Sequence, residues 1–199
     1  MLKQRIITAL ILLPIALGGF FLLEGASFAL FIGLVVTLGA WEWARLAGFP
    51  AQSARVAYAV AVAAMLFVMY LVPGIAPWVL GAAVLWWATA TVVVLSYPRT
   101  THHWAGAAAN LVIGLLILLP AWQGLIWIKQ GPLGNWQIMA VMVLVWGADV
   151  GAYFSGRAFG KRKLAPKVSP GKSWEGVYGG LALSLVITAV VGVVREWSA

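Results

Sequence analysis

The chain consists largely of apolar runs that are each about as long as a membrane is thick. An α-helix needs about 20 mostly apolar residues to cross the hydrocarbon core of a bilayer. Only 9% of the residues are charged, against about 25% in soluble domains. The sequence therefore predicts an all-α, polytopic integral membrane protein with about seven transmembrane helices. The predicted spans are residues 6–23, 26–46, 56–72, 76–96, 104–122, 135–156 and 174–194.

The first run follows Lys3 and Arg5, which is also the layout of a secretory signal peptide. It stays apolar through Leu23, for about a membrane thickness, and no clear small-residue cleavage site follows it. We therefore expect a retained first span.

Positive charge is distributed unevenly between the two sides that the spans define. Loops on the cytoplasmic side of membrane proteins are enriched in Lys and Arg. With a cytoplasmic N-terminus, that side holds all of these residues except Lys129 and Arg195. The residues on the cytoplasmic side are Lys3, Arg5, Arg45, Arg55, Arg99, Arg157, Lys161, Arg162, Lys163, Lys167 and Lys172. The bias predicts a cytoplasmic N-terminus and places residues 157–173 in the cytoplasm, where nucleotides are found.

The net charge of +8 raises the question of which partners the chain binds. Nucleic acid is not expected, because no soluble domain is present to hold a basic face. In a membrane protein, anionic lipid headgroups and phosphate-bearing substrates are the expected partners. The absence of cysteine excludes disulfides and thiolate metal sites.

The predicted spans divide the chain into two parts. Residues 1–134 would hold the first five spans, and residues 135–199 would form a helical hairpin around a basic cytoplasmic loop, 157–173. Small residues recur every four positions in both helices of this hairpin, and such stripes let membrane helices approach closely. We expect the two helices to pack tightly and to fix the ends of the loop. The stripes are Gly147, Gly151 and Ser155 in one helix, and Gly176, Gly180, Ser184, Thr188 and Gly192 in the other.

Asp149 is a lone carboxylate near the predicted cytoplasmic end of the sixth span. An acidic side chain within a span costs roughly 2.5–3.5 kcal/mol on insertion scales, so we expect it to face water or a partner. One interpretation is a ligand of a divalent metal in a phosphate site, with Tyr153 orienting it from the next turn. The alternative is a structural ion pair with Arg157 or with a lysine of the loop.

The basic loop also contains Pro166, Pro170 and Gly171 between its cations. Positive charge alone would be explained by membrane topology. However, prolines stiffen the chain, and glycine lets backbone N–H groups approach a ligand closely. Ser173 stands where an N-cap would open the last helix, and helix N-termini beside lysines bind anions. Phosphate binding is therefore predicted for this loop.

Other polar residues give weaker predictions. Gly171-Lys172-Ser173 resembles the end of a P-loop, but Pro166 occupies the position of the first glycine, so we exclude that motif. We interpret Glu175 as a partner of the dipole of the last helix, and Glu42 as a partner of Arg45 three residues later.

The residues of this region resemble those of a known family. Trp146-Gly147-Ala148-Asp149 and the run from Leu164 to Trp174, Leu-Ala-Pro-Lys-Val-Ser-Pro-Gly-Lys-Ser-Trp, are similar to the bacterial phosphatidate cytidylyltransferases, the CDP-diacylglycerol synthases. Trp41-Glu42-Trp43-Ala44 is similar to the family more weakly. The resemblance covers about residues 143–181.

The resemblance implies a reaction in phospholipid biosynthesis at the bacterial inner membrane. CTP and phosphatidic acid would give CDP-diacylglycerol and pyrophosphate, with Mg²⁺ as cofactor, in an enzyme that forms a homodimer. Asp149, Lys167 and Lys172 would then be catalytic, with Asp149 also the metal ligand. The residues that would contact CTP or the lipid phosphate are Ser169, Gly171, Ser173, Lys161 and Arg162.

One departure from the family pattern concerns the end of the chain. Family members continue into a later cytoplasmic stretch whose acids complete the metal centre, whereas this sequence stops at Ala199. Either the chain is a truncated product, or the missing part is supplied separately, or the chain is inactive. The alternative to an enzyme is a non-catalytic membrane protein that binds CTP or anionic lipid, or that acts as an assembly partner. A transporter is disfavoured, because only Asp149 and Asn110 interrupt the spans.

Overall fold

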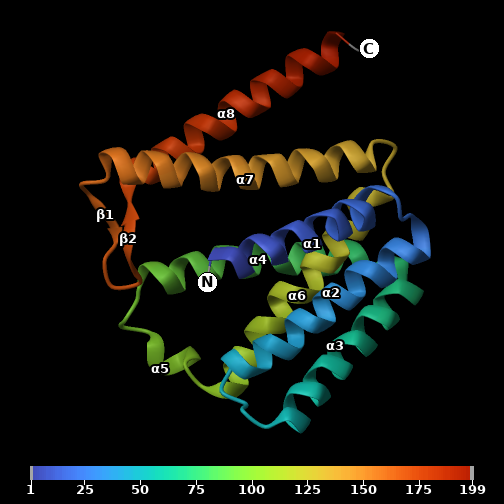
Figure 1. Cartoon of the computed structure of the whole chain (residues 1–199). Coiled ribbons are helices and arrows are strands. Elements are labelled where there is room, and N and C mark those ends of the chain that lie inside the picture. Colours follow the sequence, from blue (N-terminus) through green and yellow to red (C-terminus); the bar gives the residue numbers. More distant parts are fainter. Residues whose placement is uncertain (1, 198–199) are drawn as a thin grey trace. The chain divides into compact units, whose positions relative to one another are not determined.

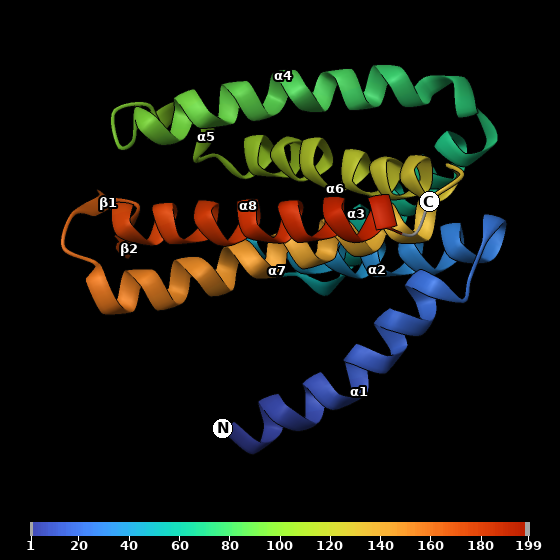
Figure 2. The same ribbon diagram turned by 90° about the horizontal axis from the view of Figure 1, so that it is seen from above.

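The structure, a computed structural model, describes residues 2–197, with side-chain surroundings for residues 10–102 and 104–193. The chain divides into two compact units, Met1–Asn135 and Trp136–Ala199, which are described one at a time. Figures 1 and 2 show the helices and strands of each unit. The predicted orientation in the membrane also used Lys3, Arg5 and Arg195. The side chains of these three residues lie outside the described ranges.

The N-terminal unit is built from helices joined by short turns. Its elements are α1 (Leu2–Phe21), α2 (Gly25–Leu46), α3 (Gln52–Leu71), the 3₁₀ turn η1 (Pro73–Ile75), α4 (Ala76–Leu95), α5 (Thr101–Trp104) and α6 (Ala107–Lys129).

The C-terminal unit contains two long helices and two short strands. Its elements are α7 (Gly134–Phe159), β1 (Lys163–Ala165), β2 (Ser169–Ser173) and α8 (Trp174–Trp197). The strands form an antiparallel hairpin that connects the end of α7 to the beginning of α8 (Figure 1).

Six of the described helical stretches are long and apolar enough to cross a membrane. In α1 the corresponding described stretch, Leu10–Phe21, is shorter. The prediction of a multi-span helical membrane protein is confirmed, and the orientation of the N-terminus stays a prediction. The six stretches are Gly25–Leu46, Gln52–Leu71, Pro73–Leu95, Ala107–Lys129, Gly134–Phe159 and Trp174–Val193.

The turn after α2 shows how local sequence ends a helix. Gly48 has a φ of +98°, a conformation that favours glycine. The Gly48 N–H donates to the Arg45 carbonyl oxygen, and the Phe49 N–H donates to that of Ala44, each at 3.1 Å. This pair of bonds is a Schellman motif, which satisfies the last carbonyl groups of the helix. The motif allows α3 to pack back against α2.

In the N-terminal unit, α2 packs on α3 and α6, and α4 packs on α6. Aromatic donors link these helices. The Trp43 indole N–H donates to the Asn110 carbonyl oxygen at 2.7 Å, and the Tyr58 hydroxyl donates to that of Leu111 at 2.8 Å. Gly114 lies against both side chains, because a Cβ atom there would meet the Trp43 indole at 2.5 Å and the Tyr58 hydroxyl oxygen at 2.6 Å. Close approach at this glycine therefore makes both hydrogen bonds possible.

Arg55 on α3 is buried against the end of α2. Its side chain donates to a Glu42 carboxylate oxygen at 3.1 Å and lies 3.6 Å from the centre of the Trp41 ring. The predicted pair of Glu42 with Arg45 is present at 3.4 Å, but Arg45 is exposed. The better-buried partner of Glu42 is thus Arg55, which lies on another helix.

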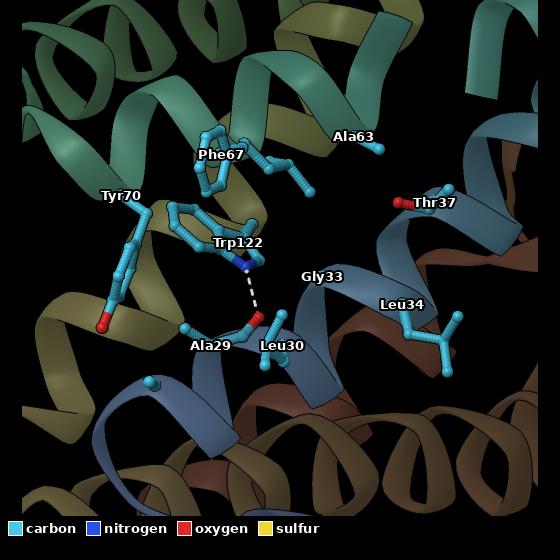
Figure 3. Close-up of a pocket in the computed structure, with 11 residues that line it drawn as sticks. Ala29, Leu30, Gly33, Leu34, Thr37, Ala63, Phe67, Tyr70 and Trp122 are labelled. Carbon is cyan, nitrogen blue, oxygen red and sulfur yellow. Dashed lines mark hydrogen bonds between the residues drawn. The ribbon is translucent and has the colours of Figure 1, made fainter. Parts of the chain in front are cut away.

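A pocket of about 510 Å³ lies between α2, α3 and α6 (Figure 3). Its walls are apolar apart from Thr37 and Tyr70. The Trp122 indole forms part of the wall and donates to the Ala29 carbonyl oxygen at 3.1 Å. None of the predicted site residues lines this pocket; all of them belong to the C-terminal unit.

Candidate functional site

The basic segment predicted as a loop contains an antiparallel hairpin of two strands. Lys163 pairs with Ser173, and Ala165 pairs with Ser169, with an irregularity in β1 between them. Residues 166–168 form the turn, where the Val168 N–H donates to the Ala165 carbonyl oxygen at 3.0 Å. The prediction of an irregular loop was therefore incomplete: these strands are short and contain Pro170 and Gly171, which are rare inside strands.

The helices on either side of the hairpin meet through small residues, as predicted. A Cβ atom on Gly151 would lie 2.5 Å from the Gly179 carbonyl oxygen, and one on Gly180 would lie 2.8 Å from that of Ala148. Gly179 was not part of the predicted stripe, and Gly192 has nothing within 4 Å of such an atom. The stripe therefore packs α7 against α8, near the ends of these helices that adjoin the two strands.

Ser173 is buried and acts as the predicted N-cap of α8. Its hydroxyl oxygen accepts the Gly176 N–H at 3.2 Å, the arrangement of a serine cap with the third residue of the helix. Gly156 and Gly160 lie around this hydroxyl, since a Cβ atom on Gly160 would be 2.8 Å from it. A direct contact of Ser173 with a substrate stays a prediction.

Glu175 does more than the predicted partner of a helix dipole would do. Its carboxylate accepts the backbone N–H groups of Lys161 and Arg162, each at 3.2 Å, and the Arg162 guanidinium at 3.4 Å. Its own carbonyl oxygen accepts the Ser155 hydroxyl at 2.7 Å. Sequence spacing gave no signal for these contacts, because Lys161 and Glu175 are separated by the whole strand pair.

The cations of the segment fall into two groups. The Arg157 guanidinium donates to the Tyr153 hydroxyl at 3.1 Å, and Arg162 pairs with Glu175. The other cations are exposed, and their side chains make no hydrogen bond or ion pair among the described residues. These free ammonium groups belong to Lys161, Lys163, Lys167 and Lys172. They are the groups available to an anionic ligand.

Two further predicted contacts lie in β2. Ser169 is half-buried at the start of the strand, opposite Ala165. Gly171 is exposed, has no positive φ, and has open space where a Cβ atom would stand. The space at Gly171 fits the prediction that a ligand approaches the backbone there.

Asp149 lies on α7 and is exposed, with no hydrogen bond or ion pair among the described residues. The alternative of an ion pair with Arg157 is not found, because Arg157 contacts Tyr153. Tyr153 likewise does not orient Asp149. The helix continues to Phe159, three residues past the predicted end of the span, so Asp149 stands about 15 Å along the axis from the helix end.

A divalent metal needs oxygen ligands, and the described residues contain no cluster of three or more acidic or histidine side chains that could hold one. In the C-terminal unit, Glu175 is engaged, which leaves Asp149 as the free described carboxylate. Mg²⁺ is commonly held by one or two carboxylates together with substrate phosphates and water. Asp149 therefore suits the role of the one carboxylate ligand in such a site. It does not supply a complete set of protein ligands.

Comparisons with known proteins give the family. The model of the cytidylyltransferase family matches residues 3–199. The chain is 70% identical over 182 residues to a phosphatidate cytidylyltransferase of Pseudomonas aeruginosa, covering 92% of this chain and 67% of the relative. It is 39% identical over 208 residues to one of Haemophilus influenzae, covering 96% of this chain and 72% of the relative. No solved structure matches the chain. The chain belongs to the cytidylyltransferase family.

Proposed function

We propose that the chain acts as a phosphatidate cytidylyltransferase, which transfers CMP from CTP to phosphatidic acid and gives CDP-diacylglycerol and pyrophosphate. The observation that carries this conclusion is the 70% identity to the Pseudomonas aeruginosa enzyme over 92% of the chain. The structure adds a suitable group of cations, because four lysines of the hairpin segment are exposed and free of protein partners among the described residues.

The reaction joins two anions. An oxygen of the phosphatidic acid phosphate attacks the α-phosphorus of CTP and forms a new P–O bond. The bond from that phosphorus to the oxygen bridging to the β-phosphate breaks, and pyrophosphate leaves with the bonding electrons. Ammonium groups fixed near the phosphates offset the repulsion and stabilise the charge that develops in the transition state.

The hairpin residues are assigned roles on this basis. Lys167 in the turn and Lys172 in β2 would bind the phosphates of the reacting groups, and Lys161 would add charge at the base of the segment. Gly171 would let the phosphates approach the backbone. The Ser169 hydroxyl in β2 would donate a hydrogen bond to CTP or to the lipid phosphate. The Arg162 guanidinium would bind phosphate only after its ion pair with Glu175 breaks, since Arg162 Nε lies 3.4 Å from Glu175 Oε1.

Asp149 would hold Mg²⁺ together with the nucleotide phosphates. When bound, the ion would offset phosphate charge and polarise the α-phosphorus. The exposed and unpaired carboxylate supports this assignment, since an acid within a span otherwise needs a partner.

The six long apolar helices support a site at a membrane, and we propose the bacterial inner membrane with the strand pair on the cytoplasmic side. The lipid substrate would then reach the site from the bilayer. Homodimerisation is also proposed. The small-residue stripe does not supply the dimer surface near the strands, because α7 and α8 occupy it between themselves.

The test is a direct assay of lipid labelling. The chain is reconstituted in liposomes with phosphatidic acid, labelled CTP and Mg²⁺, and label in lipid is measured beside an Asp149→Asn variant. We expect incorporation by the wild type and loss in the variant. CTP binding without incorporation would reject catalysis by this chain and favour the non-catalytic binding protein. Equal incorporation by both proteins would remove Asp149 from the site.

A further inference from the structure

Two backbone donors follow directly after the last turn of α7. The Gly160 N–H still donates to the Gly156 carbonyl oxygen, at 3.0 Å. The next two N–H groups, of Lys161 and Arg162, donate to the Glu175 carboxylate instead, each at 3.2 Å. Glu175 stands in the first turn of α8. One carboxylate therefore joins the end of α7 to the beginning of α8.

From this geometry we propose that Glu175 is a positioning residue for the nucleotide site. By fixing the exit of the chain from α7, it holds the lysines of the hairpin segment in the arrangement that binds the phosphates of CTP. The proposal rests on the proposed function of these lysines. Glu175 itself does not touch the substrate in this scheme.

The hairpin is held at both ends. At the end nearest α8, the Ser173 hydroxyl caps the helix and the Trp174 N–H donates to the Arg162 carbonyl oxygen at 2.9 Å. At the end nearest α7, the Glu175 carboxylate holds the N–H groups of Lys161 and Arg162. Of the free lysines, Lys163, Lys167 and Lys172 lie between these attachments, and Lys161 lies at the attachment nearest α7. Loss of one attachment would allow them to take many more arrangements, which costs binding free energy when they are ordered again.

The contact is of a strong type. The carboxylate accepts two successive backbone N–H groups, each at 3.2 Å, and hydrogen bonds to a carboxylate are stronger than those between neutral groups. The ion pair with the Arg162 guanidinium adds less, because the Arg162 side chain is 67% exposed and its charge is screened by water. The backbone contacts should therefore carry most of the effect.

Three variants separate these contributions by hydrogen–deuterium exchange of the Lys161 and Arg162 amides. Glu175→Gln keeps the size of the side chain and removes its charge. Arg162→Ala removes the ion pair and leaves the backbone contacts. Glu24→Gln is the matched control, since Glu24 is exposed and its carboxylate makes no contact among the described residues. We expect exchange to rise about tenfold in Glu175→Gln and to stay within about twofold of wild type in the other two.

The second measurement is binding of CTP with Mg²⁺ to the reconstituted chain. Glu175→Gln should raise the Kd for CTP about tenfold, with a thermal stability close to that of Glu24→Gln. Unchanged exchange would overturn the proposal, and so would raised exchange with unchanged binding. Tighter binding would also overturn it, because the carboxylate would then compete with phosphate. A wild type that binds no CTP would instead reject the proposed function, while exchange alone would still decide whether Glu175 orders the two amides.

Discussion

The Ser155 hydroxyl on α7 donates a 2.7 Å hydrogen bond to the backbone carbonyl oxygen of Glu175 on α8. This carbonyl belongs to the residue whose carboxylate holds the base of the hairpin. A Cβ atom on Gly179, one turn further along α8, would collide with the Ser155 side chain. The contact between these helices is therefore both a hydrogen bond and a close approach of backbones, which is the usual way in which membrane helices associate.

The close approach gives the first prediction. Gly179→Ala should destabilise the C-terminal unit by about 1–3 kcal/mol, because the added methyl group overpacks the interface with Ser155. Gly192→Ala on the same helix is the control, since a Cβ atom there meets nothing within 4 Å. Thermal unfolding in detergent measures both variants. Equal melting temperatures would mean that α7 and α8 do not meet at Gly179.

A second pair of glycines tests the packing of the N-terminal unit. Gly114→Ala would place a methyl carbon 2.5 Å from the Trp43 indole and 2.6 Å from the Tyr58 hydroxyl oxygen. Two hydrogen bonds to α6 would be displaced, at an average of about 0.6 kcal/mol for each such bond in a membrane protein, in addition to the strain of overpacking. Gly124→Ala on the same helix meets Leu80 at an ordinary 3.8 Å. A melting temperature lowered as much by Gly124→Ala as by Gly114→Ala would contradict this packing.

The sequence predicted several of these features because they depend on local chemistry. The spans follow from runs of apolar residues, the cap follows from Ser173 standing before a helical run, and the stripe follows from a spacing of four. The Glu175 and Arg55 contacts were not predicted. Each joins residues 13 or 14 positions apart that do not share a helix or strand, and no period in the sequence reports such a distance.

The candidate site was predicted in composition and only partly in geometry. The lysines are exposed as phosphate binding requires, but residues 163–165 and 169–173 form strands where a loop was expected. Propensity could not show this, because Pro170 and Gly171 are unfavourable in strands. The pairing becomes possible because α7 and α8 bring the ends of the segment together. Asp149 is further from the end of its helix than predicted, because the residues from Arg157 to Phe159 continue the helix.

Two arginines share one carboxylate in the N-terminal unit, and they should differ in importance. Arg55→Gln should destabilise the unit by about 1–2 kcal/mol, since Arg55 is 9% exposed and also stacks on Trp41, while Glu42 is half-exposed and screens part of the effect. Arg45→Gln removes an exposed pair and should cost at most about 0.5 kcal/mol. Chemical denaturation compares the two variants. If Arg45→Gln proved the more damaging change, the assignment of Arg55 as the principal partner would be wrong.

The last prediction concerns the free lysines. Lys172→Gln and Lys167→Gln should each lower kcat/KM by about tenfold or more, because each removes one positive charge that stabilises the phosphates in the transition state. Activity should fall without a matching loss of folding stability, since both side chains are exposed and have no protein partner among the described residues. Arg99→Gln is the control for the loss of one positive charge, because Arg99 is also exposed and lies outside the hairpin. Label incorporation into phosphatidic acid liposomes measures all three. If the Arg99 variant lost as much activity as the lysine variants, general attraction of the protein for anionic lipid would explain the effect, and the two lysines would have no place in the site.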